Sequence, residues 1–321
     1  MIKKVIGLAV LASTIGVQSS AETWNMPTPY GDANMPTKIA YQFAEEIKSK
    51  TGGELVITVH SGASLIKHPE IPRAVKSGQV QLGEVFIGTL GNEHPVFKHD
   101  NMPFVATSYA DSEKLWLAAK PEMEKLLKKD GLMLLYAVPW PAQSLYTKFP
   151  VASLADLSDS KMRAYSPSTS RLADLMGTTP TTVQVPDIPQ AFSTGIIDSM
   201  VTSPSTGANG QAWDYLTHYT SIDAWIPKNM VIVNTRAFKR LDKATQAIIL
   251  EAAANAEKSG WAGVVEQARK DTQTLIDNGI IVTAPSAQLI TELKAIGAVM
   301  SDEWLAEAPK EVGAILKAYN K

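Results

Sequence analysis

The fold is decided by residues 154–204, which read LADLSDSKMRAYSPSTSRLADLMGTTPTTVQVPDIPQAFSTGIIDSMVTSP. Short apolar runs around residues 161–165, 181–185 and 196–200 alternate here with two helix-like segments. A strand, helix, strand, helix, strand order is typical of an open α/β sheet. Ligands of such sheets lie beyond the carboxyl ends of the strands. Arg163 stands near the end of the first strand, so we predict that it contacts a ligand.

Composition limits the classes of function. The chain has 321 residues, 45% of them hydrophobic and 19% charged, and this length predicts about two domains. The formal charge is −2 and no basic stripe is present, so we do not expect nucleic acid or an anionic membrane surface as a partner. The absence of cysteine excludes thiol catalysis, thiolate metal sites and disulfides.

The N-terminal residues 1–21 have the pattern of a secretory signal peptide. Lys3 and Lys4 precede an apolar run at residues 5–17, and Ser19-Ser20-Ala21 is a small-residue cleavage pattern. The apolar run is short for a membrane anchor, which is the alternative, and no other stretch reaches the roughly 18 to 20 apolar residues of a spanning helix. We therefore expect an exported, periplasmic protein without a membrane span.

The segments before the deciding stretch predict a first lobe. Residues 22–87 alternate strand and helix signals, which predicts a β-α-β-α-β unit with parallel strands. A helical pattern follows at residues 108–129, where Pro121 favours a division into two helices. A buried-type strand at residues 132–138 leads to an extended segment at residues 143–148, which we interpret as the first crossing into a second lobe.

The segments after the deciding stretch predict that the chain crosses back to the first lobe. Residues 219–226 and 230–234 are extended and form our predicted return crossing. Asp242 then caps a long helix that ends near Asn278 and would be roughly 50 Å long, enough to lie across both lobes. We assign residues 22–142 and about 235–273 to lobe I, and residues 143–234 and about 274–321 to lobe II.

The order and spacing of several short segments carry a resemblance to a known family. These segments are Ala155-Asp156-Leu157, Lys161-Met162-Arg163, Gly177-Thr178-Thr179-Pro180-Thr181-Thr182-Val183 and Ala191-Phe192-Ser193-Thr194-Gly195-Ile196-Ile197-Asp198, with Asn101-Met102-Pro103-Phe104 upstream. In this order they resemble the TRAP-transporter solute-binding proteins, the DctP-like family. Asp159 and Ser199 stand where that family usually has glycine. The resemblance implies an α/β, two-lobe periplasmic binding protein fold with the ligand cleft between the lobes and a long helix spanning both.

The resemblance also implies roles for individual residues. It implies that Arg163 holds the carboxylate of the substrate, a task that suits a guanidinium because its fork forms two parallel hydrogen bonds to one carboxylate. Relatives that bind sugar acids carry a second Arg where this chain has Gln143, a departure that argues against a dicarboxylate. Thr202 or Ser203 would replace a ligand-binding Asn of the family or simply form a turn.

Aromatic residues next to the predicted crossings indicate an apolar cavity. Trp140 and Trp225 adjoin the crossing strands and are our candidate walls, with lobe packing as the alternative. Phe86 falls where relatives place a polar ligand contact. Such a cavity could stack a ring or pack an aliphatic acid, or hold an ammonium by cation–π attraction with Glu84 nearby.

Signals for cofactors and metals are weak. The chain has no Gly-rich dinucleotide turn, no phosphate loop and no His-Glu-x-x-His motif, so we expect no cofactor. His94, His99 and Asp100 do not have the spacing of a metal site, and we interpret them as solvated loop residues.

The resulting hypothesis is a monomeric binding protein rather than an enzyme. It would capture a small organic acid and deliver it to the membrane subunits of a TRAP permease. A sensor subunit that presents the ligand to a receptor, and a periplasmic enzyme of small acids, are the alternatives. The sequence leaves the ligand open among aliphatic, aromatic and sugar acids, sulfonates and zwitterions.

Overall fold

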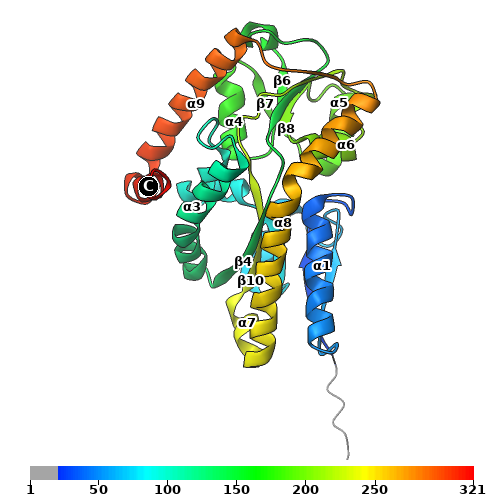
Figure 1. Ribbon diagram of the computed structural model, residues 1–321, viewed down its shortest axis with the longest axis vertical. Coiled ribbons are helices and arrows are strands. Elements are labelled where there is room, and N and C mark those ends of the chain that lie inside the picture. Colours follow the sequence, from blue (N-terminus) through cyan, green and yellow to red (C-terminus); the bar gives the residue numbers. More distant parts are fainter. Residues whose placement is uncertain (1–20) are drawn as a thin grey trace, which may run out of the picture.

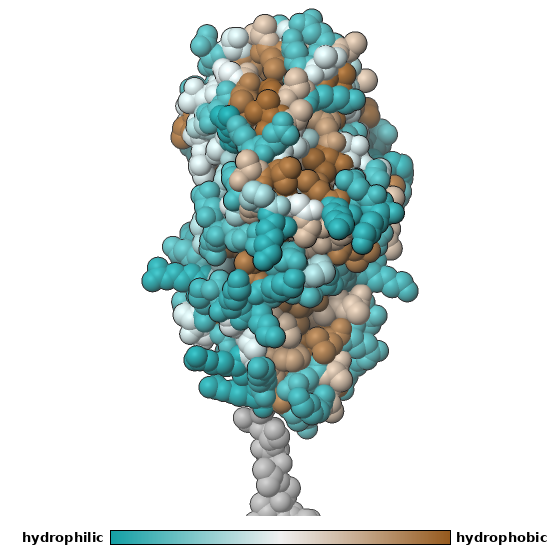
Figure 2. Space-filling view, turned by 90° about the vertical axis from the view of Figure 1, so that its left-hand side faces the viewer, coloured by the Kyte–Doolittle hydropathy of each residue, from teal (hydrophilic) through white to brown (hydrophobic). Residues whose placement is uncertain are grey.

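The computed structural model describes residues 21–321 and places them in two lobes that are joined by several chain crossings (Figure 1). The predicted export signal covers residues 1–21, of which residues 1–20 lie outside the described part of the chain. No helix among the described residues is both long and apolar enough to cross a membrane. On the face seen in Figure 2, hydrophobic residues form separate patches between polar and charged ones.

Lobe I is built on two small sheets. β1 (Glu22–Pro27) and β2 (Leu55–His60) pair in parallel. β3 (Leu82–Phe86) and β4 (Leu132–Pro139) both pair in the antiparallel sense with β10 (Lys228–Asn234), which lies between them. The helices of this lobe are α1 (Met35–Lys50), α2 (Ile71–Ser77), α3 (Tyr109–Lys129) and α7 (Thr235–Arg240).

Non-local pairing corrects two expectations for lobe I. The predicted parallel β-α-β-α-β unit is wrong at its third strand, because β3 pairs with the distant strand β10 and not with β1 or β2. The expected lobe II extends to residue 234, whereas β10 lies in the sheet of lobe I. We therefore propose a lobe boundary near Pro227. The expected division of the 108–129 helix is also wrong, since α3 is continuous through Pro121.

Lobe II contains one mixed six-stranded sheet. Its strands lie in the order β11 (Ile281–Thr283), β9 (His218–Thr220), β5 (Ser144–Thr147), β8 (Ser199–Thr202), β6 (Lys161–Ala164) and β7 (Thr179–Thr182). The helices α4 (Pro167–Leu175), α5 (Ile188–Ser193) and α6 (Pro204–Asn209) connect these strands to one another. The three strands of the deciding stretch are parallel neighbours, as predicted. The last two lie two or three residues from their expected positions.

The crossing segments between the lobes pair with each other. The N–H of Trp140 donates to the carbonyl of Pro227 at 2.8 Å, and the N–H of Gln143 donates to the carbonyl of Trp225 at 2.9 Å. The N–H of Ala224 returns a bond to the carbonyl of Gln143 at 2.9 Å. Residues 140–143 and 224–227 therefore form a paired connection between the lobes, at the ends of the predicted crossing and return segments.

The long helix α8 (Lys243–Asp277) spans both lobes, as predicted (Figure 1). Asp242 caps it by accepting hydrogen bonds from the N–H groups of Ala244 and Thr245 at 2.8 and 3.0 Å. It packs against α1 and β4 in lobe I and against α6 in lobe II. Close contact with β4 requires Gly260, because a Cβ there would stand 2.9 Å from Cγ1 of Val138.

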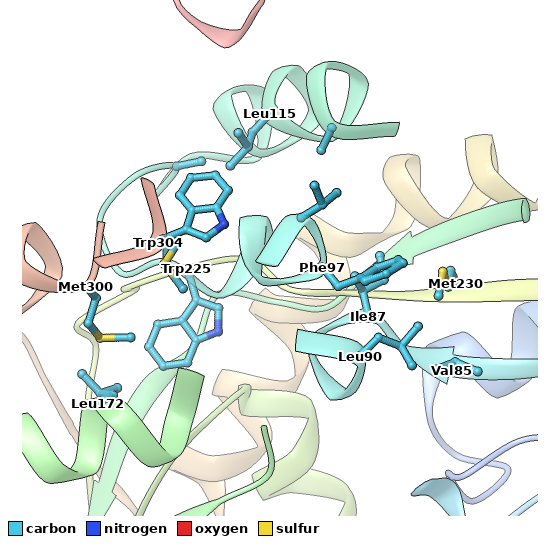
Figure 3. Packing of buried hydrophobic residues seen from close by; sticks show 14 of the residues in the cluster. Val85, Ile87, Leu90, Phe97, Leu115, Leu172, Trp225, Met230, Met300 and Trp304 are labelled. Carbon is cyan, nitrogen blue, oxygen red and sulfur yellow. The ribbon is translucent and has the colours of Figure 1, made fainter. Parts of the chain in front are cut away.

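The C-terminal helices contact both lobes beside the connection between them. α9 (Ala287–Glu307) contacts α4 of lobe II, and α10 (Pro309–Tyr319) packs against α3 of lobe I. One apolar cluster continues through this region. Figure 3 shows Trp225 of the return crossing beside Leu172 of α4 and Met300 and Trp304 of α9. Residues 274–321 thus contact both lobes.

His99 and Asp100 are buried, which corrects their interpretation as solvated loop residues. Asp100 accepts a hydrogen bond from the N–H of Lys228 at 2.8 Å, and its carboxylate lies 3.9 Å from the ammonium of Lys228. That ammonium donates to the hydroxyl of Ser112 at 2.9 Å. Burial lowers the pKa of Lys228 to about 8. These bonds fix the start of β10, where the return crossing enters lobe I.

Gly260 and Gly263 provide a matched test of the packing of α8. Gly260→Ala should lower the free energy of unfolding by about 1–3 kcal/mol, because overpacking against Val138 outweighs the gain in helix propensity. Gly263→Ala should instead raise it by about 0.5–1 kcal/mol, because its Cβ would meet only Sδ of Met35 at 3.8 Å. Urea denaturation measures both, and a stabilising Gly260→Ala would contradict the packing described here.

Candidate functional site

A cavity lies between the lobes, at the crossing segments. Lobe II lines it with residues that follow or end its parallel strands, namely Arg163, Tyr165, Gln184, Val185, Thr202, Ser203 and Thr206. Lobe I and the crossings contribute Tyr30, His68, Phe86, Trp140, Gln143 and Pro227. The structure thus brings six of the seven predicted site residues together around one cavity.

Arg163 is the charged centre of the cavity. It lies on β6 between its neighbours β7 and β8, with only 3% of its surface exposed. Its Nε donates to the carbonyl of Val183 at 2.9 Å, which leaves the N–H groups of both Nη atoms for other partners. No carboxylate of the described residues lies within 4.0 Å of it. The buried charge therefore has no anionic partner within residues 21–321.

Burial lowers the pKa of Arg163 to about 10, which leaves the guanidinium charged near neutral pH. The ring of Tyr165 supports it, with Cζ of Arg163 4.7 Å from the ring centre. Such cation–π contact offsets part of the cost of desolvation. A charge that is buried without a partner is costly, so the arrangement favours an anion as the occupant of the cavity.

Gln143 is held in place by two hydrogen bonds. Its Nε2 donates to the carbonyl of Pro141 at 2.8 Å, and its Oε1 accepts from the hydroxyl of Tyr165 at 3.0 Å. The amide therefore fixes the ring that supports Arg163, and one N–H of Nε2 remains for a ligand. Gln143 brings no second positive charge to the cavity.

The remaining walls are largely aromatic. Tyr30, Phe86 and Trp140 form one buried cluster, and Phe86 meets Tyr165 of lobe II edge to face at 5.4 Å between ring centres. Tyr30 and Trp140 are in edge contact at 4.9 Å. Such walls suit a compact ligand with apolar faces.

A buried polar group behind this wall orients two of its rings. Oδ1 of Asn229 accepts from the indole of Trp140 at 2.9 Å and from the hydroxyl of Tyr30 at 3.3 Å. Nδ2 of Asn229 donates to Glu84 at 2.6 Å. Burial raises the pKa of Glu84 to about 7. Glu84 thus lies behind the aromatic wall, where it contacts Asn229, and does not line the cavity.

The two predicted hydroxyl residues differ in their surroundings. Ser203 caps α6, because its Oγ accepts from the N–H of Thr206 at 3.1 Å and lies 3.1 Å from the hydroxyl of the same residue. Thr202 ends β8, and the described residues offer its hydroxyl no hydrogen-bond partner. Thr202 is therefore the freer of the two to bind a ligand.

The structure does not bring Trp225 to the cavity. Its side chain is 2% exposed and packs in the apolar cluster with Leu172 and Trp304 (Figure 3). The return crossing directs Pro227 to the cavity instead. A tryptophan beside a crossing strand can face either the cleft or the core, and the sequence pattern does not distinguish these directions.

Sequence reasoning missed Tyr30, His68, Tyr165 and Gln184. Tyr165 directly follows β6, and Gln184 comes two residues after β7. The rule that ligands lie beyond the carboxyl ends of parallel strands could have found both. His68 could not have been found in this way, because it begins a short 3-10 turn (His68–Glu70) and its place depends on how the lobes meet.

Comparison with known proteins fits this geometry. A profile of the bacterial extracellular solute-binding proteins of family 7, DctP, matches residues 30–308. The chain belongs to this family. The expected two-lobe α/β fold of a TRAP-type solute-binding protein is thereby confirmed.

Solved structures of this family are closely similar. DctP7 of Bordetella pertussis, an extracytoplasmic solute receptor binding pyroglutamic acid, is 48% identical with a TM-score of 0.93, covering 94% of this chain and 100% of that one. DctP6 of the same organism, also binding pyroglutamic acid, is 41% identical with a TM-score of 0.92, covering 93% of this chain and 99% of that one.

In sequence comparison, a solute-binding protein of Chromohalobacter salexigens is 25% identical over 278 residues, which cover 85% of this chain and 81% of the relative.

The buried carboxyl of Glu84 should make stability depend on pH. Its pKa in the folded protein, about 7, lies above the usual value of about 4.3, so the folded state favours the neutral form. Stability should therefore decrease as the pH rises from about 4.3 through 7. Glu84→Gln should flatten this decrease, whereas Glu45→Gln, at an exposed position of α1, should leave it unchanged. Equal slopes in urea denaturation for wild type and Glu84→Gln would contradict this assignment.

Proposed function

We propose that this DctP-family protein captures pyroglutamate, or a closely related cyclic carboxylate, between its lobes. The observation that carries the proposal is Arg163, a buried charged guanidinium that faces the cavity without a carboxylate partner among residues 21–321. A ligand carboxylate would supply that partner through two parallel hydrogen bonds. Gln143 in place of a second cation fits a ligand with one negative charge.

The rest of the cavity fits a small ring better than a sugar acid. A sugar acid carries a hydroxyl on most carbons, each of which needs a hydrogen-bond partner when buried. Tyr30, Phe86 and Trp140 instead offer apolar faces and edges. A ring of methylene groups with one amide would leave fewer polar groups unmatched. The pyroglutamate-binding relatives at 48% and 41% identity support this ligand class.

We further propose the cellular setting that the sequence predicts. The chain would be exported, cleaved after Ala21 and active as a monomer in the periplasm, where it delivers its ligand to the membrane subunits of a TRAP permease. The ligand would leave the cavity chemically unchanged, since capture and release, not catalysis, is the task of the family. N-terminal sequencing of the secreted protein should begin at Glu22.

Calorimetric titration with pyroglutamate tests the ligand class. We expect saturable 1:1 binding of pyroglutamate and much weaker binding of glucuronate, whose hydroxyls the aromatic walls leave unpaired. Any bound ligand has to be removed beforehand by unfolding and refolding. Tighter binding of glucuronate than of pyroglutamate would refute the proposed class.

Arg163 variants test the carboxylate contact. Arg163→Ala should weaken pyroglutamate binding roughly 30- to several-thousand-fold, because removing one partner of a buried charge pair costs about 2–5 kcal/mol. Arg163→Lys should also bind poorly, since one ammonium cannot replace the fork. Arg171→Ala, at an exposed position of α4, is the matched control and should keep wild-type affinity. Near-normal affinity of Arg163→Ala would show that the carboxylate lies elsewhere.

A further inference from the structure

His68 and Gln184 form a hydrogen bond from one lobe to the other at the edge of the cavity. Nδ1 of His68, in lobe I, lies 3.2 Å from Oε1 of Gln184, which follows β7 in lobe II. Both side chains line the cavity, and they also line a second hollow beside it. Gln184 is the neighbour of Val183, whose carbonyl orients Arg163. The two groups are therefore placed where the lobes and the ligand meet.

The protein backbone fixes which nitrogen of His68 carries the proton. The N–H of Phe86 donates to Nε2 of His68 at 3.2 Å, and a backbone N–H can only donate. Nε2 must therefore accept, so the proton of the neutral ring lies on Nδ1. Burial lowers the pKa of His68 to about 4, which keeps the ring neutral near pH 7. The ring is also held at its edge by Tyr30, at 5.9 Å between centres.

The fixed proton of His68 in turn fixes the amide of Gln184. Nδ1–H donates, so the atom that faces it must be the acceptor Oε1. Nε2 of Gln184 then presents its two N–H groups elsewhere, and the described residues offer it no acceptor. Gln184 lines the cavity, so this neutral donor is available to a ligand there. A carbonyl oxygen of the ligand would complement it.

We propose that Gln184 determines specificity by donating from Nε2 to the ring carbonyl of the ligand, and that His68 positions it for this contact across the cleft. The proposal rests on the proposed function, since Arg163 must hold the carboxylate for the ring carbonyl to reach Gln184. His68 is a positioning residue, because it acts through Gln184. The contact is complete only when the lobes are together, so closure would depend on the carbonyl of the ligand.

Binding of three carboxylates can distinguish the contribution of the ring carbonyl from that of the rest of the ligand. Pyroglutamate has the ring N–H and carbonyl, 3-oxocyclopentanecarboxylate keeps the carbonyl but has a methylene in place of the N–H, and cyclopentanecarboxylate lacks both. Wild type should bind the ketone roughly 10- to 100-fold more tightly than cyclopentanecarboxylate, since a donor built for a carbonyl is left unpaired by the plain ring.

Substitutions of Gln184 test the donor. Gln184→Met keeps the length of the side chain but has no donor, so it should lose most of the preference for the ketone and weaken pyroglutamate binding roughly 10- to 100-fold. Binding of cyclopentanecarboxylate should change less than about threefold. Asn209→Ala is the matched control, because Asn209 also bonds across the lobes, to Asn34 at 3.0 Å, but does not line the cavity. It should affect all three ligands equally.

Substitutions of His68 test the positioning. His68→Phe keeps a ring beside Tyr30 but cannot donate to Gln184, so the preference for the ketone should fall as in Gln184→Met. His68→Asn can place an amide N–H near the position of Nδ1 and should restore part of the preference. Thermal unfolding without ligand establishes that each variant is folded.

The outcomes distinguish this inference from the proposed function. Full pyroglutamate affinity in Gln184→Met, or an equal loss for cyclopentanecarboxylate and the ketone, would overturn the role of Gln184 and leave the carboxylate contact of Arg163 intact. Retained preference in His68→Phe would overturn the positioning role. A wild-type protein that binds neither carbonyl-bearing ligand would refute the proposed function and, with it, this inference.

Discussion

The guanidinium of Arg163 is a buried charge that the described part of the protein does not neutralise. Taking a charge out of water is expensive unless a partner compensates it. Here the compensation is partial: one hydrogen bond to the carbonyl of Val183 and the face of Tyr165. Part of the desolvation cost of the guanidinium therefore remains uncompensated until an anion binds. The attraction between such an anion and Arg163 is stronger in this cavity than the attraction to an arginine on the surface, where solvent and salt screen the charges.

The rest of the site serves to hold this charge and its surroundings in one geometry. Gln143 fixes Tyr165, which supports Arg163, and Asn229 fixes Tyr30 and Trp140 in the opposite wall. Each of these amides uses both its oxygen and its nitrogen within the protein. A site with rotamers locked in this way needs little reorganisation when the ligand enters, which favours affinity and selectivity together.

The two lobes are joined at this site by several segments that pair or pack with one another. The crossing segments pair with each other, α8 packs on both lobes, and α9 and α10 contact α4 and α3. Hinge closure about such a connection is a known way in which binding proteins enclose a ligand. A ligand selects the closed form only through contacts that are better there. Arg163 lies in one lobe, and Phe86 and His68 in the other, so an occupant of the cavity would contact both.

The sequence by itself determined the local alternation of strands and helices, the long helix after Asp242 and the position of Arg163 at the end of a parallel strand. These follow from short-range periodicity, helix caps and strand order, which neighbouring residues encode. Pairing between distant segments was decided only by the tertiary structure. It put β10 into lobe I, turned Trp225 into the core and brought His68 to Gln184 across 116 residues. The physical reason is that the direction of a side chain beside a crossing, and the partner of a strand, depend on how two lobes pack, which no local pattern records.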